Sequence, residues 1–455
     1  MTVHKPFDEM TLQELVTGGG YDCECGRHHT CAMKYLNIGP GILNEVPEML
    51  KAAGSRKPFI LYDRNTYEAA GRSVLAILEG AGIPYSAWEI PERDGKRIAP
   101  AEWELGSCVF HFDPSCDLIL GVGSGVINDL CKCLGKTAGL DTAIIGTAPS
   151  MDGYASDSGS MEVNGIKVSV YCKAPVAILL DTEILAQAPA RMLVAGFGDM
   201  IAKYIAICEW RVSAMVTGEH YCEGIAGMMR AAVNRIMKAA DGIPSRDPEA
   251  IRYIAEGLVI SGIAMAYLGN SRPASGLEHY FSHVWEMMAM ERHKPYDLHG
   301  IQVGIGTVLT LELYREIKKI TPDRSALETA IQAFDEREWL ENTRRIFGSC
   351  ADEIVGITES AGLNSTEKRR AHFDILEKNW GEVLRIIEEE LPEPDEIAAA
   401  VRTTGMLTRP EEIGIGREDT VMAFIGSRNL RNKYLTSTLI WDLGLTERFA
   451  GLTGQ

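Results

Sequence analysis

Short apolar runs in the first 180 residues have the pattern of buried strands. Residues 57–63 read KPFILYD, residues 116–123 read CDLILGVG, and residues 143–150 read AIIGTAPS. Each run ends in glycine or polar residues, as the strands of a buried parallel sheet do. Residues 67–80 have helical spacing and end in a glycine turn, which predicts a βαβ unit.

After Pro189 the hydrophobic pattern becomes almost wholly helical. Long helical patterns cover residues 250–268, 302–317 and 364–390, and the charged segment 324–393 is typical of a solvated helical extension. A chain of 455 residues exceeds what one core usually organises. We therefore predict an α/β domain over residues 1–188 and an all-helical domain over residues 189–455.

Composition narrows the class of protein. The chain is 46% hydrophobic and 24% charged, which is ordinary for a folded soluble protein, and its N-terminal MTVHKPFDEM lacks the apolar run of a signal peptide. No uninterrupted apolar run suggests a membrane span. The eleven cysteines are spread along the chain and are expected to be reduced thiols in a cytoplasmic protein. A net charge of −18 argues against nucleic-acid partners. If the substrate is a phosphate, its binding site must supply local hydrogen-bond donors.

The segment GVGSGVIND, residues 121–129, is a candidate phosphate loop. It follows a predicted strand and opens a helix, so its glycines and the helix N-terminus could receive a pyrophosphate. The spacing is G-x-G-x-G, so a tight β/α turn is the alternative interpretation. Asp63, at the end of an earlier strand, could accept hydrogen bonds from a ribose and favour NAD over NADP; its alternative role is an N-cap.

Three histidines and one aspartate form a candidate metal site. Asp199 follows two glycines in GFGDMIAKY, His279 and His283 are four residues apart on one helix face, and His299 begins another helical pattern. One carboxylate with two imidazoles suits a catalytic divalent metal, which assists alcohol–ketone interconversion. The alternative is histidines that serve only packing.

A second group of metal-ligand side chains lies near the N-terminus, within nine residues. It consists of Cys23, Cys25, His28, His29 and Cys31. A structural zinc is one interpretation, and a hairpin of reduced thiols is the other, because no second cysteine pair follows at zinc-finger spacing.

Seven motifs together resemble the bacterial branch of the glycerol-1-phosphate dehydrogenases. They occur in order as CECGRHH, GVGSGVIND, GTAPSMDGYASDSGSM, GFGDMIAKYIAICEW, SRPASGLEHYFSH, LHGIQVGIGT and NLRNKYLTSTLIWDLGL. This family belongs to the superfamily of glycerol dehydrogenase, iron-containing alcohol dehydrogenases and 3-dehydroquinate synthase. The resemblance implies a Rossmann-like N-terminal domain, an all-α C-terminal domain of the dehydroquinate synthase-like type, and a metal in the cleft.

The resemblance also implies roles for individual residues. Asp199, His279 and His299 would ligate the metal, and Asp199 would also face the substrate. His283 would contact the substrate and serve the proton path, and Asp152 would touch the substrate hydroxyls. The NAD(H) or NADP(H) contacts would be Gly125, Val126, Ile127, Asn128, Asp129, Thr147, Ala148, Pro149, Ser150 and Ser156.

One departure from the iron-type relatives bears on the metal. Those enzymes place a histidine four residues after the aspartate, where this chain has Lys203. A three-ligand Zn²⁺ or Ni²⁺ site is therefore expected. Arg272, with Ser271 and Ser275, is the hypothesis for the substrate phosphate contact, and a loop-fixing salt bridge is the alternative.

The reaction implied is NAD(P)H-dependent reduction of dihydroxyacetone phosphate to sn-glycerol 1-phosphate, which would serve phospholipid or phosphate-ester metabolism. A glycerol dehydrogenase would use the same metal site without a phosphate contact. A 3-dehydroquinate synthase would carry a glutamate where this chain has Asp199, and a silent metal-binding protein is the non-enzymatic alternative. A homodimer is the default expectation for the assembly.

Overall fold

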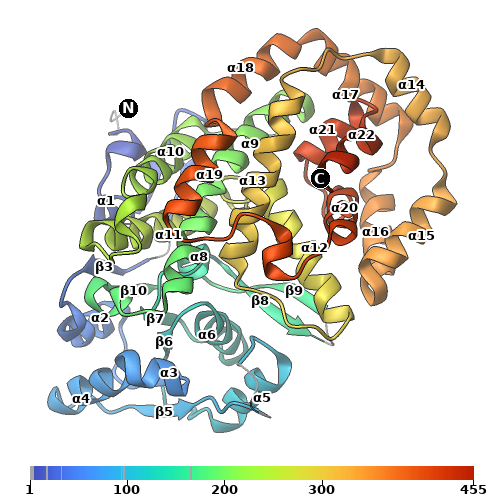
Figure 1. Cartoon of the computed structure of the whole chain (residues 1–455). Helices are drawn as coiled ribbons and strands as arrows, with labels where there is room; N and C mark the ends of the chain where they lie inside the picture. The colour runs from blue at the N-terminus through green and yellow to red at the C-terminus, as the bar shows by residue number, and fades with distance from the viewer. Residues whose placement is uncertain are drawn as a thin grey trace. The chain divides into compact units, whose positions relative to one another are not determined.

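A six-stranded, all-parallel sheet dominates the N-terminal half of the computed structural model (Figure 1). The structure describes residues 5–16, 19–31, 33–93, 95, 98–163 and 166–454. The strand order is β3-β10-β7-β6-β4-β5, and two antiparallel hairpins, β1-β2 and β8-β9, accompany the sheet. The strands are β1 (Tyr21–Asp22), β2 (His28–His29), β3 (Tyr35–Gly39), β4 (Pro58–Tyr62), β5 (Ser86–Glu89), β6 (Leu118–Gly123), β7 (Thr142–Gly146), β8 (Ser158–Val163), β9 (Ile166–Tyr171) and β10 (Ala177–Asp181).

The chain divides into two compact units that do not follow the predicted boundary. The first unit comprises residues 1–200 and 223–271, and the second comprises residues 201–222 and 272–455. The predicted division after residue 188 does coincide with the end of the strand-containing part, because β10 is the last strand among the described residues. Two long helices beyond it nevertheless pack in the first unit, since their apolar faces are buried against the α/β elements there.

Helices cover both faces of the sheet in the first unit. The helical elements of this unit are η1 (Phe7–Glu9), α1 (Leu12–Val16), η2 (Leu43–Glu45), α2 (Val46–Ala53), α3 (Arg64–Thr66), the π-helical turn η3 (Tyr67–Gly71), α4 (Arg72–Gly80), α5 (Glu102–His111), α6 (Gly125–Ala138), η4 (Asp152–Ala155), α7 (Thr182–Ala186), α8 (Ala190–Ile201), α10 (Glu223–Lys238), η5 (Ala240–Gly242) and α11 (Pro248–Leu268). The predicted strands 57–63, 116–123 and 143–150 and the helix at 67–80 are all present.

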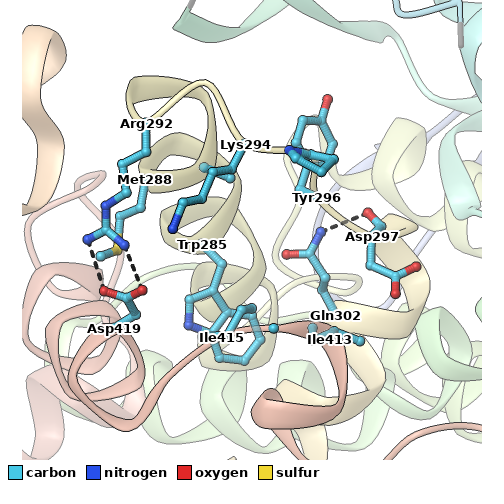
Figure 2. Close-up of a pocket in the computed structure, with 13 residues that line it drawn as sticks. Trp285, Met288, Arg292, Lys294, Tyr296, Asp297, Gln302, Ile413, Ile415 and Asp419 are labelled. Carbon is cyan, nitrogen blue, oxygen red and sulfur yellow. Dashed lines mark hydrogen bonds and ion pairs between the residues drawn. The ribbon is translucent and has the colours of Figure 1, made fainter. Parts of the chain in front are cut away.

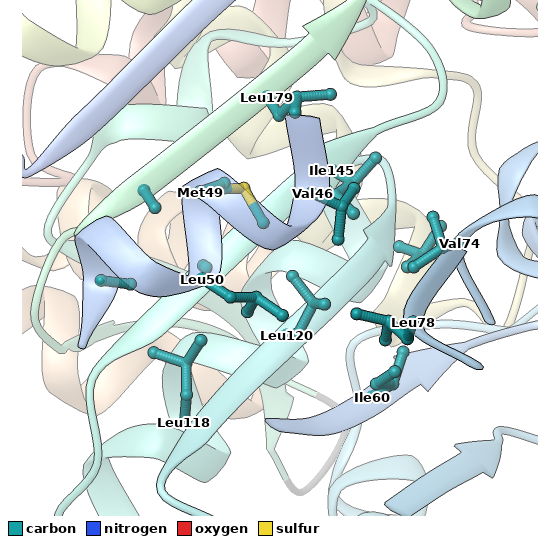
Figure 3. Packing of buried hydrophobic residues seen from close by; sticks show 14 of the residues in the cluster. Val46, Met49, Leu50, Ile60, Val74, Leu78, Leu118, Leu120, Ile145 and Leu179 are labelled. Carbon is teal, nitrogen blue, oxygen red and sulfur yellow. The ribbon is translucent and has the colours of Figure 1, made fainter. Parts of the chain in front are cut away.

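The core of the sheet has two sides because alternate strand residues point to opposite faces. On one side Leu118, Leu120 and Ile145 pack with Val46 and Val74 from the covering helices (Figure 3). The opposite side, lined by other residues of the same strands, is covered by α5 and α6 and by the hairpin β8-β9. Burial on both sides explains why these strands read as continuous apolar runs.

Helix α11 is the one described helix that is long and apolar enough to cross a membrane. Its most apolar window has a mean hydropathy of 1.4, and 72% of that window is buried inside the protein. Arg252 and Glu256 interrupt the apolar sequence and form an ion pair at 3.5 Å. Such burial is what the core helix of a folded domain shows.

Helices are the regular secondary structure of the second unit, whose described residues include no strand. Its elements are α9 (Lys203–Thr217), α12 (Leu277–Glu291), α13 (His299–Ile317), α14 (Arg324–Ala333), α15 (Glu336–Phe347), η6 (Gly348–Cys350), α16 (Ala351–Ala361), α17 (Thr366–Lys378), α18 (Trp380–Glu390), α19 (Pro394–Thr403), η7 (Pro410–Ile413), α20 (Arg417–Ser427), α21 (Thr436–Asp442) and α22 (Thr446–Thr453). The pattern at 364–390 is two helices separated at Asn379, and the charged segment 324–393 is helical as predicted.

Candidate functional site

The glycine turn between β6 and α6 matches the predicted phosphate loop. A Cβ on Gly123 would lie 2.5 Å from Ile127 Cγ1, and a Cβ on Gly121 would lie 2.7 Å from Ile144 Cδ1. The glycines therefore allow the strand, the turn and the helix to pack closely. Helix α6 has 14 residues, and the first N–H groups of a helix have no intrahelical partners, so its N-terminus suits an anionic group.

The loop after β7 lies directly against this turn. The Thr147 amide donates to the Gly123 carbonyl oxygen at 3.1 Å, and the hydroxyls of Ser124 and Ser150 are 2.7 Å apart. Strands β6 and β7 are neighbours, so the residues predicted to contact the dinucleotide at 125–129 and 147–150 come from adjoining strand ends. Parallel α/β sheets bind ligands at this edge.

Two residues predicted as dinucleotide contacts also have partners for their side chains within the first unit. Asn128 Nδ2 donates to the Gly153 carbonyl oxygen at 3.0 Å, and Asp129 pairs with the buried Lys132 at 3.2 Å. Burial raises the pKa of the Asp129 carboxyl. Lys132 also donates to Ser156 Oγ at 3.1 Å, so the predicted contact Ser156 is held by a lysine that the sequence analysis missed. No sequence signal marked Lys132, because the acceptors of its hydrogen bonds at Gly153 and Ser156 lie more than twenty residues away.

Asp63 follows β4 and has the geometry of a helix N-cap, which is the alternative role given for it above. Its Oδ1 accepts a hydrogen bond from the Thr66 amide at 2.8 Å, and the Thr66 hydroxyl accepts one from the Asp63 amide at 2.9 Å. This reciprocal pair is a capping box at the start of α3. Strand β4 is a neighbour of β6 in the sheet, so Asp63 also lies at the same sheet edge as the glycine turn.

Asp199 is fixed by a close contact between α8 and the loop after β7. A Cβ on Gly196 would come within 1.9 Å of the Pro149 carbonyl oxygen, so only glycine permits this approach. One helical turn later, Asp199 is fully buried, and its Oδ2 accepts a hydrogen bond from the Asp152 amide at 2.9 Å. Asp152 in turn accepts from Ser261 Oγ of α11 at 2.8 Å. The structure thus brings the two predicted aspartates together within the first unit.

The three predicted histidines gather on α12 and α13 within the second unit. The ring centroids of His279 and His299 are 5.4 Å apart, and those of His283 and His299 are 5.6 Å apart. His279 and His283 lie one turn apart on α12, with centroids at 6.3 Å. Two helices that contact each other extensively therefore present three imidazoles to one another.

Buried carboxylates behind these histidines orient two of the rings. His279 Nδ1 lies 2.8 Å from Glu278 Oε1, and His299 Nδ1 lies 3.4 Å from Glu286 Oε1 and 3.0 Å from Ser282 Oγ. A histidine whose Nδ1 faces an acceptor presents its other ring nitrogen as a metal ligand. Glu278 and Glu286 are fully buried and were not predicted, because the sequence offers no sign of which helical glutamates point inward.

His283, Glu286 and His299 also have ligand atoms within 4.8 Å of one another. This triad is a second way for α12 and α13 to hold a cation. Glu286 lies on the Nδ1 side of His299, which suits the orienting role. Lys203, the residue in the fourth-ligand position of iron-type relatives, is fully buried and donates to the Ala274 carbonyl oxygen at 2.9 Å.

Arg272 makes contacts of the kind expected for a salt bridge that fixes its loop, which is the alternative interpretation given above. It pairs with Glu219 at 2.6 Å, donates to Ser213 Oγ at 2.8 Å, and donates to the Tyr434 carbonyl oxygen at 2.7 Å. The side chain is almost completely buried. These contacts connect α9, the loop before α12 and the segment before α21 within the second unit, so the guanidinium stabilises the packing of these segments.

Two buried carboxylates meet beside the loop at Gly276. A Cβ on Gly276 would lie 2.7 Å from Glu209 Oε2 and 2.7 Å from Glu278 Oε2. Burial, and then the neighbouring charge of Glu278, raises the pKa of Glu209. The other oxygen of Glu209 accepts from the amide and the hydroxyl of Thr436, which keeps the carboxyl in place.

A pocket opens at the C-terminal end of α12 in the second unit (Figure 2). Arg292 and Asp419 form a two-contact ion pair on its wall at 2.6 and 2.9 Å. Gln302 on its floor donates to the Asp297 carbonyl oxygen at 2.9 Å and lies 3.4 Å from Glu286 Oε1. The pocket is therefore connected to the carboxylate that orients His299.

The residues of each unit fit the groups that the resemblance implies. In the first unit, the glycine turn and the N-terminus of α6 fit a dinucleotide phosphate, and Asp199 supplies a buried carboxylate. In the second unit, His279 and His299 supply imidazoles whose Nδ1 atoms face acceptors. Such donors suit a divalent cation that assists the reduction of a carbonyl.

Comparisons with known proteins agree with these features. Residues 37–189 match the family described as iron-containing alcohol dehydrogenase. The chain is 35% identical over 322 residues to the glycerol-1-phosphate dehydrogenase [NAD(P)+] of Halalkalibacterium halodurans, covering 70% of this chain and 81% of that protein. It is 33% identical over 309 residues to the enzyme of the same name from Methanosarcina acetivorans, covering 65% and 83% of the two chains.

The fold has a solved counterpart in glycerol dehydrogenase from Schizosaccharomyces pombe. The superposition has a TM-score of 0.59 at 15% identity and covers 92% of this chain and 90% of the other. At this identity the likeness shows the fold alone, and it confirms the predicted combination of an α/β N-terminal part with a helical C-terminal part.

Proposed function

We propose, because the chain belongs to the glycerol-1-phosphate dehydrogenase family, that it reduces dihydroxyacetone phosphate to sn-glycerol 1-phosphate with NADH or NADPH. The observation that carries this proposal is the 35% identity that extends over 81% of the Halalkalibacterium halodurans enzyme. The glycine turn of the first unit and the oriented histidines of the second unit support it, because hydride transfer to a ketone needs a dinucleotide site and an electrophile.

The dinucleotide is proposed to bind at the strand ends of the first unit. The backbone at Gly125, Val126 and Ile127 begins α6, where N–H groups would receive the pyrophosphate. Thr147, Ala148, Pro149 and Ser150 form the loop against this turn. Asn128 would act through η4, and Asp129 and Ser156 would act through Lys132. Asp63 would approach a ribose with the carboxylate oxygen that does not cap α3.

The metal is proposed to be Zn²⁺ or Ni²⁺, held by Asp199, His279 and His299. The buried carboxylate and the two oriented imidazoles support this set, and the buried Lys203 leaves no fourth histidine at the iron-type position. A bound divalent metal would polarise the ketone, and the reduced nicotinamide would supply the hydride.

The remaining chemistry belongs to side chains of the chain itself. His283, one turn beyond His279, is proposed to deliver the proton that the new hydroxyl requires. Asp152, held by Ser261, is proposed to accept hydrogen bonds from the substrate hydroxyls. Asp199 would face the substrate as well as the metal, because it accepts a hydrogen bond from the amide of Asp152, the residue proposed to contact the substrate.

Contact between Arg272 and the substrate phosphate remains a prediction with a strong structural alternative. The Arg272→Lys variant separates the two, since lysine keeps the charge but cannot reproduce the three-partner geometry. A structural role predicts equal losses of activity toward phosphorylated and unphosphorylated substrate, together with a lower Tm. A phosphate contact predicts a rise in KM for the phosphorylated substrate alone.

The decisive experiment measures oxidation of NADH and NADPH by metal-reconstituted protein, with dihydroxyacetone phosphate and dihydroxyacetone as parallel substrates. The product is then assigned by a stereospecific assay for sn-glycerol 1-phosphate. We expect a strong preference for the phosphorylated ketone and the sn-1 product. Preference for dihydroxyacetone would identify a glycerol dehydrogenase instead, and no oxidation with either ketone would contradict the proposal.

The assembly and location are proposed on the same basis. We propose a cytoplasmic homodimer that serves glycerophospholipid metabolism, in keeping with the small-molecule substrate and the reduced thiols. Light scattering on the eluted protein would measure the assembly directly, and a monomeric mass would contradict it.

A further inference from the structure

The tip of the β1-β2 hairpin presents two cysteines and a histidine that the proposed reaction does not use. The turn is tight, because the Gly26 amide donates to the Cys23 carbonyl oxygen and the Cys23 amide donates to the Arg27 carbonyl oxygen, each at 2.9 Å. Gly26 has a φ of +83°, a left-handed conformation that favours glycine. The turn brings the Cys23 and Cys25 side chains close to His29 of β2.

The donor atoms of these three side chains converge. The ligand atoms of Cys23, Cys25 and His29 lie within 4.8 Å of one another, and Cys25 Sγ is 3.2 Å from His29 Nε2. His29 is fully buried, and its Nδ1 lies 2.8 Å from the Tyr267 carbonyl oxygen. A carbonyl can only accept, so Nδ1 carries the proton and Nε2 directs its lone pair toward the sulfur atoms. Metal-bound histidines are typically held in this way.

His28 has the opposite arrangement and serves as an internal contrast. Its Nδ1 lies 2.9 Å from Asp22 Oδ1 and its Nε2 lies 3.0 Å from the Gly19 carbonyl oxygen, so both ring nitrogens face acceptors. The residue is exposed. Of the two adjacent histidines that the sequence could not separate, the structure selects His29.

A third sulfur, and the fourth donor of the group, is Cys222, which directly precedes α10. The backbone at Gly224 lies beside the hairpin, since a Cβ built there would be 3.8 Å from Cys23 Sγ and 3.0 Å from Phe7 Cδ2. Cys222 precedes Gly224 by two residues, so chain geometry alone keeps their Cα atoms within roughly 7 Å. The side chain of Cys222 is fully buried. This cysteine is nearly 200 residues from the hairpin in sequence, which explains why zinc-finger spacing is absent.

We propose that Cys23, Cys25, His29 and Cys222 bind one structural Zn²⁺. Three thiolates and one imidazole form a closed, soft donor set of the kind that structural zinc takes, without a position for substrate. Binding would release the thiol protons and join the hairpin to α10. The hydrogen bond from His29 to Tyr267, and the packing of Phe7 at 5.3 Å from the Tyr267 ring, would extend that connection to α11.

The first test loads the full chain with Co²⁺ in place of zinc and records its absorption spectrum. Thiolate-to-cobalt charge transfer in the near ultraviolet, with the intense visible bands of tetrahedral cobalt, is expected. The proposed catalytic ligands are one carboxylate and two imidazoles, so they cannot produce thiolate bands. If cobalt binds without any thiolate band, the proposed zinc site is wrong, and the proposed catalytic site is not contradicted. If the thiolate bands appear but the protein oxidises NADH with neither ketone, the zinc site stands and the proposed function is wrong.

The second test compares matched substitutions by metal analysis of purified protein. Cys25→Ser and Cys222→Ser are each expected to lose one zinc per chain and the thiolate bands, and to lower Tm by at least about 5 °C. The controls are Cys31→Ser and His28→Ala, from the same hairpin, which are expected to keep both signals. NADH oxidation at the catalytic site should persist in soluble Cys25→Ser protein.

The alternative is a thiol–imidazole hydrogen bond between Cys25 and His29 without a metal. In that case the wild-type chain would show no thiolate band, and Cys222→Ser would have the same zinc content as the wild type. Either result refutes the zinc site. Because the cobalt spectrum is taken on the wild-type chain, the proposal stays testable even if a cysteine variant fails to fold.

Discussion

The glycine turn of the first unit and the histidine helices of the second unit build their sites in different ways. At the turn, the groups that would hold a dinucleotide are backbone amides, and small residues at Gly121, Gly123 and Gly196 permit the close packing. On α12 and α13 the functional groups are side chains, each aimed by a buried partner such as Glu278 or Glu286. The residues that form the glycine turn are close together in sequence, whereas the histidine site depends on which faces of α12 and α13 pack against each other.

The largest expected effect comes from removing an imidazole. His279→Ala should lower kcat/KM for the ketone phosphate by about a thousand-fold, because carbonyl polarisation contributes several kcal/mol to catalysis. Steady-state NADH oxidation measures the loss. His293→Asn is the control, since His293 is exposed and its φ of +53° is tolerated by asparagine. Full activity in His279→Ala would show that the helices carry no catalytic ligand.

The next effect tests the carboxylate behind His299. Glu286→Gln keeps the size of the side chain but weakens the acceptor at 3.4 Å from His299 Nδ1, so metal affinity should fall by about 10- to 100-fold. Activity titrated against free metal concentration gives the affinity, and saturating metal should restore most of the rate. If Glu286 is instead a ligand with His283 and His299, saturating metal should fail to rescue.

A smaller effect on stability is expected when the close packing at Gly196 in the first unit is disturbed. Gly196→Ala places a methyl group 1.9 Å from the Pro149 carbonyl oxygen, so the backbone must shift, at a cost of about 1–3 kcal/mol in the free energy of unfolding. Gly227→Ala on α10 is the matched control. Nothing lies within 4 Å of its added Cβ, and the substitution should stabilise the protein by about 0.5–1 kcal/mol. Denaturant unfolding measures both, and equal effects would contradict the close-packing argument.

The smallest effect concerns the carboxyl pair at Gly276. Burial and Glu278 raise the pKa of Glu209 above its usual 4.5, so the folded protein keeps a proton that the unfolded chain has lost. Stability should therefore fall as pH rises from about 4.5 through the raised pKa, by at most about 1.4 kcal/mol per pH unit, and then level off. Glu209→Gln should remove this slope. The exposed Glu388→Gln should keep it, and an unchanged slope in Glu209→Gln would refute the assignment.

Much of the first unit could be predicted from sequence because its determinants are short-range. The strands at β4, β6 and β7 were visible as apolar runs, and the helix after Gly125 followed from the glycine turn. The positions that the sequence left open were decided by long-range partners. Asn128 and Lys132 both lie on α6, yet Asn128 donates to the Gly153 carbonyl oxygen and Lys132 donates to Ser156 Oγ, and these partners lie more than twenty residues further along the chain.

The amino-acid sequence by itself determined the elements, the family and the types of chemical group available, since periodicity, turn residues and motifs are read along the chain. Only the tertiary structure decided which partner each group has. It placed Arg272 against Glu219, oriented His279 with Glu278, and chose His29 rather than His28 beside Cys25. The physical reason is that a buried polar or charged group must be satisfied where it lies, and its partner can come from any part of the chain that packing brings there.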